Sequence, residues 1–207
     1  MASMSLWLKA ARSFTLLELL VVTAIISVLA ALLVPTLSQM KERAHRIQCL
    51  SNLRQIGIGA RQYANDHEGQ FPLQIGGGNL PADHCRLMSN YLQNIGQIFK
   101  CPSGIKTATN NLSTIANSNI SFCYVEDVSL QSLVEMPFMF DQGIPIPPVG
   151  TLSLYLGQRW QTGSVPNSNH KNDGGNIVFS DSRVEFKSVF PTSYGGGSSP
   201  NVRDPGP

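Results

Sequence analysis

The chain has 207 residues, of which 42% are hydrophobic, 14% are charged and 8% are aromatic. The charged fraction lies well below the ~25% typical of soluble domains, and the length excludes a large multidomain enzyme. With 15 basic and 13 acidic side chains, the net charge is +2. This surplus is too small for a nucleic-acid-binding protein, whose phosphate contacts require clustered Lys and Arg.

An apolar run begins close to the N-terminus. Residues 14–34 read FTLLELLVVTAIISVLAALLV, with Glu18 as the single charge. As a helix, the run is long enough to span the ~30 Å hydrocarbon core of a membrane. A secretory signal peptide cleaved near Ala30 is the alternative. Glu18 argues against it. In a membrane helix, a carboxylate costs about 2.5–3.5 kcal/mol at the centre of the bilayer, and some of that cost remains at Glu18, which lies nearer the cytoplasmic end. Glu18 either reaches the membrane interface or is compensated by another group.

The residues that flank this run bear on its orientation and its end. Lys9 and Arg12 precede it without any acidic residue, which favours a cytoplasmic N-terminus. Basic residues also follow the run, so charge counting alone does not decide the orientation. Pro35 comes directly after the run, and it either kinks a continuing helix or ends the membrane helix.

The start of the apolar run carries a recognisable motif. Residues 12–19, RSFTLLEL, resemble the processing site of type IV prepilins and type II secretion pseudopilins: a short basic leader, a small residue, then Phe-Thr-Leu-x-Glu opening the helix. The resemblance implies that residues 1–13 are a leader peptide, which the prepilin peptidase removes between Ser13 and Phe14. It also implies N-methylation of Phe14. Ser13 departs from the family, which strongly prefers Gly at that position.

The same resemblance implies a function and a set of partners. Glu18 would pair with the Phe14 ammonium of a neighbouring subunit in a filament, and Pro35 would loosen the helix. The chain would be a structural subunit, not an enzyme, of a type IV pilus-like or type II secretion pseudopilus filament. Implied partners are the prepilin peptidase, other pilins or pseudopilins, an inner-membrane platform protein and an assembly ATPase. The implied location is the bacterial inner membrane, with a cytoplasmic N-terminus and a periplasmic head.

Residues 36–66 continue with helical periodicity and form the predicted stem. Apolar or small residues recur at steps of three or four, and polar side chains occupy the opposite face. Gly57 and Gly59 predict either close approach of the head or a local break. The stem and the residues up to Pro72 resemble a pseudopilin-like subfamily whose members also carry a C-terminal motif of His, nine residues and Asp-Gly. The apolar stripe consists of Met40, Ala44, Ile47, Leu50, Leu53, Gly57, Ala60 and Ala64.

Residues 67–190 predict a small α+β head, so the fold class is α+β and pilin-like: a long N-terminal helix packed on an antiparallel β domain. We expect a short helix at 84–92 and no regular buried element over 102–119. Strands are expected at 121–125, 136–140, 153–156, 176–180 and 183–186, the last two joined by a tight turn at Asp181-Ser182. Residues 191–207 are predicted to be a disordered tail.

The last hairpin is where the subfamily's C-terminal motif would lie. Ten residues instead of nine separate His170 from Asp181, and Ser182 replaces Gly. We expect turn-forming and hydrogen-bonding roles for this segment. Asp173 and Asp181 are weak calcium candidates, because calcium requires six to eight oxygen ligands and the segment offers few carboxylates. No metal or other cofactor is otherwise predicted.

The four cysteines, Cys49, Cys85, Cys101 and Cys123, are candidates for disulfides if the head is exported. Three pairings are possible. A zinc site formed by Cys85, Cys101, Cys123 and His84 matches no standard ligand spacing and is not expected. No standard catalytic motif occurs. Two other functions stay open: a membrane-anchored ligand- or glycan-binding module that does not polymerise, and a protein secreted after signal peptidase I cleavage.

Overall fold

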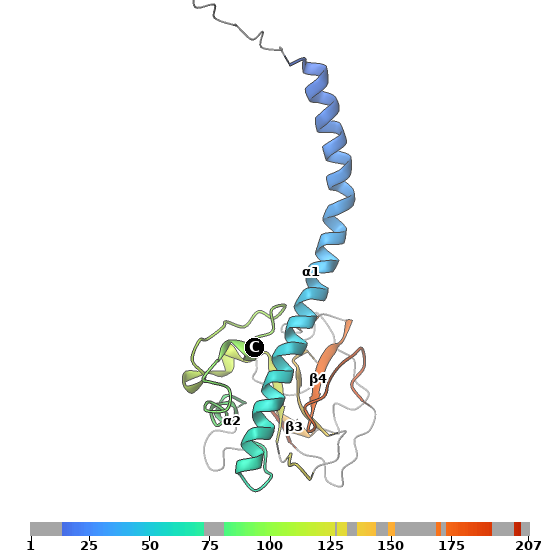
Figure 1. The fold of residues 1–207 in the computed structure, drawn as a ribbon. Coiled ribbons are helices and arrows are strands. Elements are labelled where there is room, and N and C mark those ends of the chain that lie inside the picture. Colours follow the sequence, from blue (N-terminus) through green and yellow to red (C-terminus); the bar gives the residue numbers. More distant parts are fainter. Residues whose placement is uncertain are drawn as a thin grey trace, which may run out of the picture. The chain divides into compact units, whose positions relative to one another are not determined.

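The computed structural model describes residues 14–72, 81–126, 128–131, 136–143, 149–151, 169–170, 173–191 and 201–203. The leader with Ser13, the strand predicted at 153–156 and most of the predicted tail lie outside the described residues. The chain divides into two compact units, Met1–Lys41 and Glu42–Pro207. Helix α1, Leu16–Asp66, contributes residues to both units and is continuous (Figure 1).

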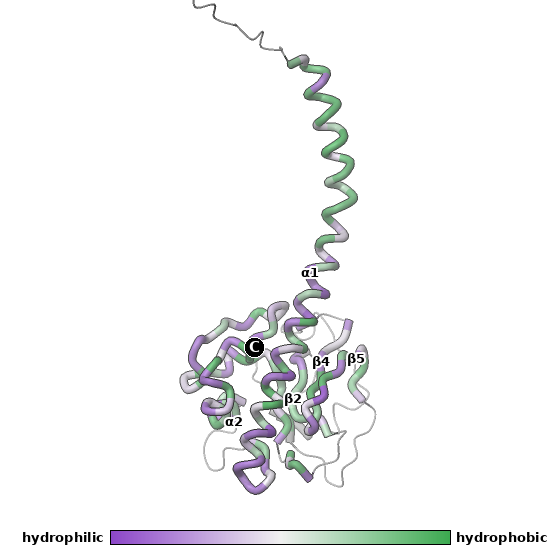
Figure 2. The backbone as a smooth tube through the Cα atoms, viewed as in Figure 1, coloured by the Kyte–Doolittle hydropathy of each residue, from purple (hydrophilic) through white to green (hydrophobic). Residues whose placement is uncertain are grey.

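In the first unit, α1 is an apolar helix whose large hydrophobic side chains are exposed. Its large hydrophobic side chains from Leu16 to Val34 are 45% to 81% exposed, and they form the hydrophobic stretch of Figure 2. Among the described residues, α1 is the one helix long and apolar enough to cross a membrane. Its hydroxyl groups bond to the helix backbone, as Ser27 Oγ does to the Ala24 carbonyl at 2.8 Å. The helix continues through Pro35, so this proline does not end it.

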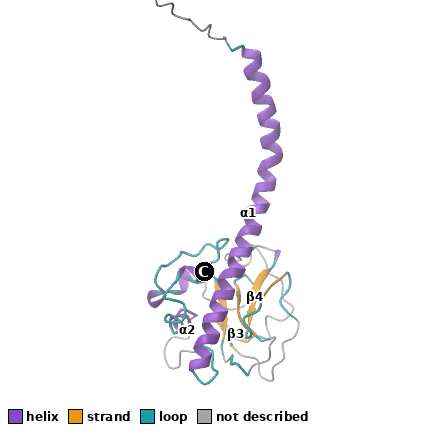
Figure 3. Ribbon diagram, in the orientation of Figure 1, coloured by secondary structure: helices purple, strands orange, loops and turns teal. Residues whose placement is uncertain are grey.

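The second unit contains an antiparallel sheet (Figure 3). The described strands run in the order β3-β6-β1-β2-β4-β5, and every neighbouring pair is antiparallel. The predicted α+β class is therefore confirmed. A short helix, α2 (Pro81–Arg86), precedes three single 3₁₀ turns, η1 (Gln97–Phe99), η2 (Leu112–Thr114) and η3 (Asn117–Asn119). The strands are β1 (Phe122–Val125), β2 (Pro137–Asp141), β3 (Val149–Thr151), β4 (Gly175–Phe179), β5 (Val184–Lys187) and β6 (Asn201–Arg203).

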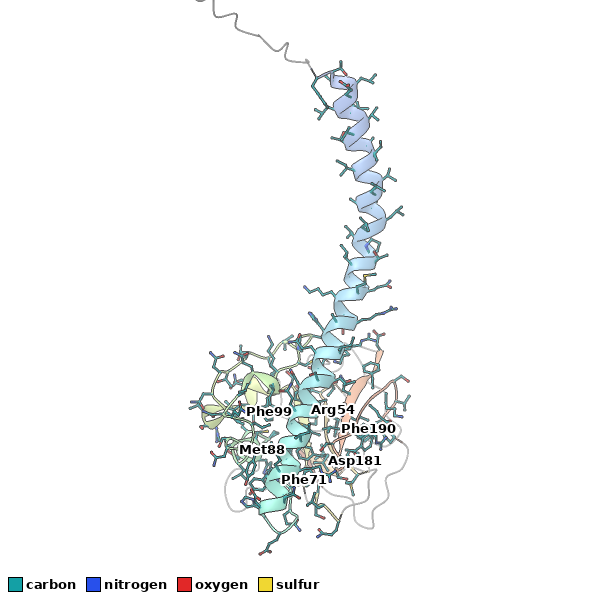
Figure 4. All side chains as sticks on the ribbon, viewed as in Figure 1. Arg54, Phe71, Met88, Phe99, Asp181 and Phe190 are labelled. Atoms are coloured by element: carbon teal, nitrogen blue, oxygen red, sulfur yellow. The ribbon has the colours of Figure 1, made fainter. Side chains whose placement is uncertain are left out.

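The core of this unit lies between the C-terminal part of α1, the sheet and the loops that follow α2. Leu53 and Ile56 of α1 are fully buried in it. Aromatic rings fill the centre: the centroid of Phe138 lies 4.9 Å from that of Phe71 and 5.2 Å from that of Tyr124. Figure 4 labels Phe71, Met88 and Phe99 of this core beside the C-terminal part of α1. Such burial is the main stabilising contribution in a small domain.

Gly57 and Gly59 bring α1 close to its neighbours, which is one of the two roles expected from the sequence. A Cβ atom on Gly57 would lie 2.8 Å from Val178 Cγ2 and 3.3 Å from Ser182 Cα. On Gly59 it would lie 2.4 Å from Leu92 Cδ2. The helix is unbroken at both positions, so the glycines permit contact rather than interrupt the helix.

Several expectations are corrected by the structure. Asn201–Arg203 forms β6 between β1 and β3, where a disordered tail was predicted; pairing with strands far away in sequence leaves no local signal. Helix α2 ends at Arg86 and does not extend to residue 92. Met40 and Ile47 are exposed, so the buried stripe of the stem begins after them. Strands β1, β2, β4 and β5 lie where four of the five strands were expected.

The four cysteines are free and buried. The disulfides considered from the sequence are therefore not present in this structure. Cys49 and Cys101 lie close together, as described below, and burial raises the pKa of the Cys85 thiol well above its ordinary value.

Candidate functional site

The N-terminal end of α1 is closed by a reciprocal pair of hydrogen bonds. The Glu18 amide donates to Thr15 Oγ1 at 3.1 Å, and the Thr15 amide donates to Glu18 Oε2 at 3.0 Å. This arrangement is a capping box, which satisfies backbone amides that a helix start leaves free. Glu18 therefore has a local role that the sequence analysis missed, although the Thr-x-x-Glu spacing signals it. Phe14, the residue before the cap, is 69% exposed.

A second constellation lies inside the Glu42–Pro207 unit. It brings together Cys49 of α1, Cys101 after η1, Asp141 at the end of β2 and His170 before β4. All four residues are buried, and one ligating atom from each lies within 4.8 Å of the others. Among the described residues, this is the one group of three or more Cys, His, Asp or Glu side chains with such convergence. We refer to these four residues as the Cys-Asp-His cluster.

The members of the cluster contact one another directly. Cys49 Sγ donates to Asp141 Oδ1 at 3.2 Å. His170 Nε2 lies 3.5 Å from Cys101 Sγ and 3.4 Å from Asp141 Oδ2. The Nε2 atom of His170 thus faces Cys101 and Asp141, while the Nδ1 atom points away from the cluster.

Polar groups outside the cluster fix the orientation of Asp141. Asn169 Nδ2 donates to Asp141 Oδ1 at 2.7 Å. The Asn176 amide and Asn176 Nδ2 donate to Asp141 Oδ2 at 2.6 and 2.8 Å. Asp141 has no exposed surface, so these bonds replace the hydration that the carboxylate loses on burial.

A carboxylate outside the cluster orients His170 in the same way. His170 Nδ1 lies 2.9 Å from Glu42 Oε1 on α1. Ser103 Oγ donates to the same carboxylate at 2.9 Å, and Arg46 lies 3.7 Å from it. With Nδ1 bonded to Glu42, the Nε2 atom is directed into the cluster.

The cluster perturbs the acidity of its own members. Burial lowers the pKa of His170, but the hydrogen bonds and charges of Asp141 and Cys101 outweigh burial and raise this pKa to about 11. Burial raises the pKa of Cys49. Burial acts in the same direction on Cys101, yet the hydrogen bonds from Cys49 and His170 bring the pKa of Cys101 below its ordinary value. Cys101 is therefore the more readily ionised of the two thiols.

The residues singled out from the sequence fall in different places. His170 lies in the cluster, whereas Asp181 lies in the turn between β4 and β5 and accepts a bond from the Arg183 amide at 2.9 Å. Asp173, the other weak calcium candidate, pairs with Arg46. His84 Nε2 lies 3.2 Å from Glu126 Oε1. Within the described residues, His84 belongs to no group of side chains that converge as metal ligands would.

The sequence analysis did not predict the Cys-Asp-His cluster, and it did not single out Asp141. The four residues of the cluster are spread over positions 49 to 170, so no spacing pattern connects them. One signal was present: Asp141 directly follows the apolar residues of β2, PFMF, where a carboxylate ending a buried strand requires partners.

Comparison with known families bears on the first of these two sites. Residues 8–34 match the family described as the prokaryotic N-terminal methylation motif. The chain has a type IV prepilin-like N-terminus. This prepilin-like motif is typical of structural pilin-type proteins and not of an enzyme class. Together with the apolar α1 segment, it fits a protein anchored in the inner membrane.

The match ends at Val34, so the resemblance of the later segments to the pseudopilin-like subfamily stays a prediction. No curated protein and no solved structure matches the chain.

Proposed function

We propose that this chain is a prepilin-like structural subunit of a type IV pilus-like or type II secretion pseudopilus filament. The prepilin peptidase cleaves it between Ser13 and Phe14, and it polymerises through the apolar part of α1. Before assembly it spans the inner membrane once, with its N-terminus in the cytoplasm and its head in the periplasm. The observation that carries the proposal is the methylation motif at residues 8–34 on a helix whose apolar side chains are exposed.

The exposed apolar surface of α1 supports both stages of the proposed pathway, the membrane-bound subunit and the filament. Side chains that are 45% to 81% exposed over five turns of helix require either lipid or other apolar helices around them. Moving the helix from lipid into a bundle of like helices changes its surroundings little in polarity. An assembly ATPase can therefore drive that exchange without overcoming a large difference in solvation.

Glu18 and Phe14 supply the specificity of the contact. Cleavage leaves an ammonium group on Phe14, and the Glu18 carboxylate of a neighbouring subunit offsets its charge in the apolar bundle. The capping box does not prevent this pairing, because an ionised carboxylate accepts about four hydrogen bonds. Bonds to Thr15 use some of these sites, and the remainder are free to accept from an ammonium.

The two roles of Glu18 are separated by a matched pair of variants in cells that carry the assembly system. Glu18→Ala removes the carboxylate and with it the carboxylate's half of the capping box, whereas Thr15→Ala removes the hydroxyl's half and keeps the carboxylate. We expect Glu18→Ala to insert into the membrane but to reduce filaments at least tenfold. Thr15→Ala weakens the helix start by about 1 kcal/mol and should assemble within a factor of about two of the wild type.

The rival functions give different outcomes in the same cells. A membrane-anchored module that does not polymerise predicts that Glu18→Ala behaves as the wild type in every assembly and secretion assay. A secreted protein predicts a mature N-terminus close to Ala30. Equal loss of filaments in both variants would show that Glu18 acts through the cap and would contradict the charge-pairing proposal.

A further inference from the structure

We propose that the Cys-Asp-His cluster is a structural zinc site, in which Cys49, Cys101, Asp141 and His170 bind one Zn²⁺ ion. Its members come from α1, the loop after η1, β2 and the segment before β4. One ion would therefore join four separate parts of the Glu42–Pro207 unit. This inference is independent of the proposed filament function.

The distances in the cluster fit a tetrahedral ion. Zinc bonds of about 2.0–2.3 Å separate tetrahedral ligand atoms by about 3.3–3.8 Å. The observed separations are 3.5 Å from Cys101 Sγ to His170 Nε2, 3.4 Å from His170 Nε2 to Asp141 Oδ2 and 3.2 Å from Cys49 Sγ to Asp141 Oδ1. These three separations are close to those that the ion requires, and one ligating atom from each of the four residues lies within 4.8 Å of the others.

The donor set selects the metal. Two thiolates and an imidazole suit zinc, whereas calcium and magnesium take oxygen ligands. Four protein ligands fill the coordination sphere of a structural zinc ion and leave no position for water or substrate. On binding, each thiol gives up one proton to the solvent and the His170 imidazolium gives up another, so that His170 coordinates through the Nε2 lone pair as a neutral ring. The double positive charge of the ion then offsets two of the three negative charges on the buried thiolates and carboxylate.

The surroundings provide the outer support that such sites have. Metal-binding histidines donate their second ring nitrogen to a carboxylate or carbonyl, and metal-binding carboxylates are themselves hydrogen-bonded. Glu42 lies 2.9 Å from His170 Nδ1. Asn169 and Asn176 donate to Asp141. Both halves of this pattern are present.

A catalytic role for the same atoms is less well supported. Cys101, His170 and Glu42 have the order of a nucleophile, a base and an orienting group. Cys101 and His170, however, have no exposed surface, and a nucleophile has to reach its substrate. A disulfide between Cys49 and Cys101 is the second rival, and it would leave Asp141 and His170 converging on no ligand.

The test uses the full chain in detergent, reduced, stripped with a chelator and then dialysed against Zn²⁺ or Co²⁺. We expect one zinc ion per chain and a cobalt form with tetrahedral ligand-field bands and a thiolate-to-cobalt charge-transfer band. Cys49→Ser and Cys101→Ser should each weaken zinc binding at least 100-fold. Cys85→Ser, which removes another buried thiol outside the cluster, should bind zinc as the wild type does. Glu42→Ala should weaken binding 10- to 100-fold, as loss of an outer partner does.

Three results would overturn the proposal. The first is that Cys49→Ser and Cys101→Ser bind zinc as tightly as the wild type does. The second is a wild-type cobalt form without the thiolate band, a result that does not depend on any variant folding. The third is peptide mapping that finds a Cys49–Cys101 disulfide, with Cys85 still a free thiol, in protein purified without reductant.

Discussion

The segment before Glu42 and the unit that begins there satisfy their side chains in opposite ways. In the first, large apolar side chains from Leu16 to Val34 are exposed, and Glu18 bonds within its own helix turn. In the second, the carboxylate of Asp141 is fully buried and held by groups from three parts of the chain. The apolar side chains of the first segment therefore need lipid or other helices around them, whereas the second unit surrounds its buried side chains with groups of its own.

The largest expected effect on the free energy of unfolding comes from removing an aromatic ring at the centre of the Glu42–Pro207 unit. Phe138→Ala deletes a fully buried side chain that packs on Phe71 and Tyr124. We expect it to lower the free energy of unfolding by about 3–5 kcal/mol. Denaturant unfolding of the full chain in detergent measures this change.

The control for Phe138→Ala lies in the other segment. Leu29 is 55% exposed, and Leu29→Ala should leave the unfolding of the head within about 0.5 kcal/mol of the wild type. A large loss of head stability in Leu29→Ala would show that the exposed apolar segment contributes to the folding of the head, against the difference described above.

A smaller effect is expected at β6, a strand that the sequence analysis did not predict. Val202 is fully buried between β1 and β3. Val202→Ala removes two methyl groups at about 0.8 kcal/mol each, so the free energy of unfolding should fall by about 1.5–2.5 kcal/mol. Val21→Ala, at a 45% exposed position of α1, is the matched control. Identical unfolding of Val202→Ala and the wild type would argue that β6 does not contribute to the sheet.

Gly57→Ala tests the close contact between α1 and the β4–β5 hairpin. Alanine gains up to about 1 kcal/mol of helix propensity, but its Cβ would lie 2.8 Å from Val178 Cγ2 and 3.3 Å from backbone. Overpacking of this kind costs about 1–3 kcal/mol, so we expect a net loss of about 1–2 kcal/mol. Ser51→Ala, at an exposed position of the same helix, should be neutral or slightly stabilising in the same unfolding assay.

The smallest effect is expected at the rim of the sheet. Lys187 Nζ lies 2.6 Å from Glu185 Oε2, and both side chains are partly exposed. Exposed ion pairs contribute up to about 1 kcal/mol. Lys187→Ala should therefore change the free energy of unfolding by less than about 1 kcal/mol, and the change should shrink further in high salt. A loss comparable to that of Phe138→Ala would contradict this assignment.

The features that were predictable from the sequence are those that local order encodes. The apolar helix, the prepilin-like motif and the β4–β5 hairpin each depend on residues within about 30 positions of one another. The stem periodicity located Leu53, Ala60 and Ala64 correctly in the core. It failed at Met40 and Ile47, because an apolar stripe does not say where along a helix the head begins.

The Cys-Asp-His cluster and β6 were not predictable for the same physical reason. His170 and Cys49 meet only after the sheet and α1 have packed, and β6 pairs with strands at least 50 residues away in sequence. The sequence identified both cysteines and His170 as notable but assigned them to disulfides and a turn. Composition shows which side chains have metal-binding chemistry, whereas tertiary packing decides which of them converge.

The most direct test of the central claim is intact-mass and N-terminal analysis of the chain produced in a host with an active prepilin peptidase. The account predicts a mature chain that begins at N-methylated Phe14, with Ser13→Gly processed at least as completely as the wild type. A wild-type and a Ser13→Gly chain that both retain Met1, or a mature N-terminus near Ala30, would contradict it.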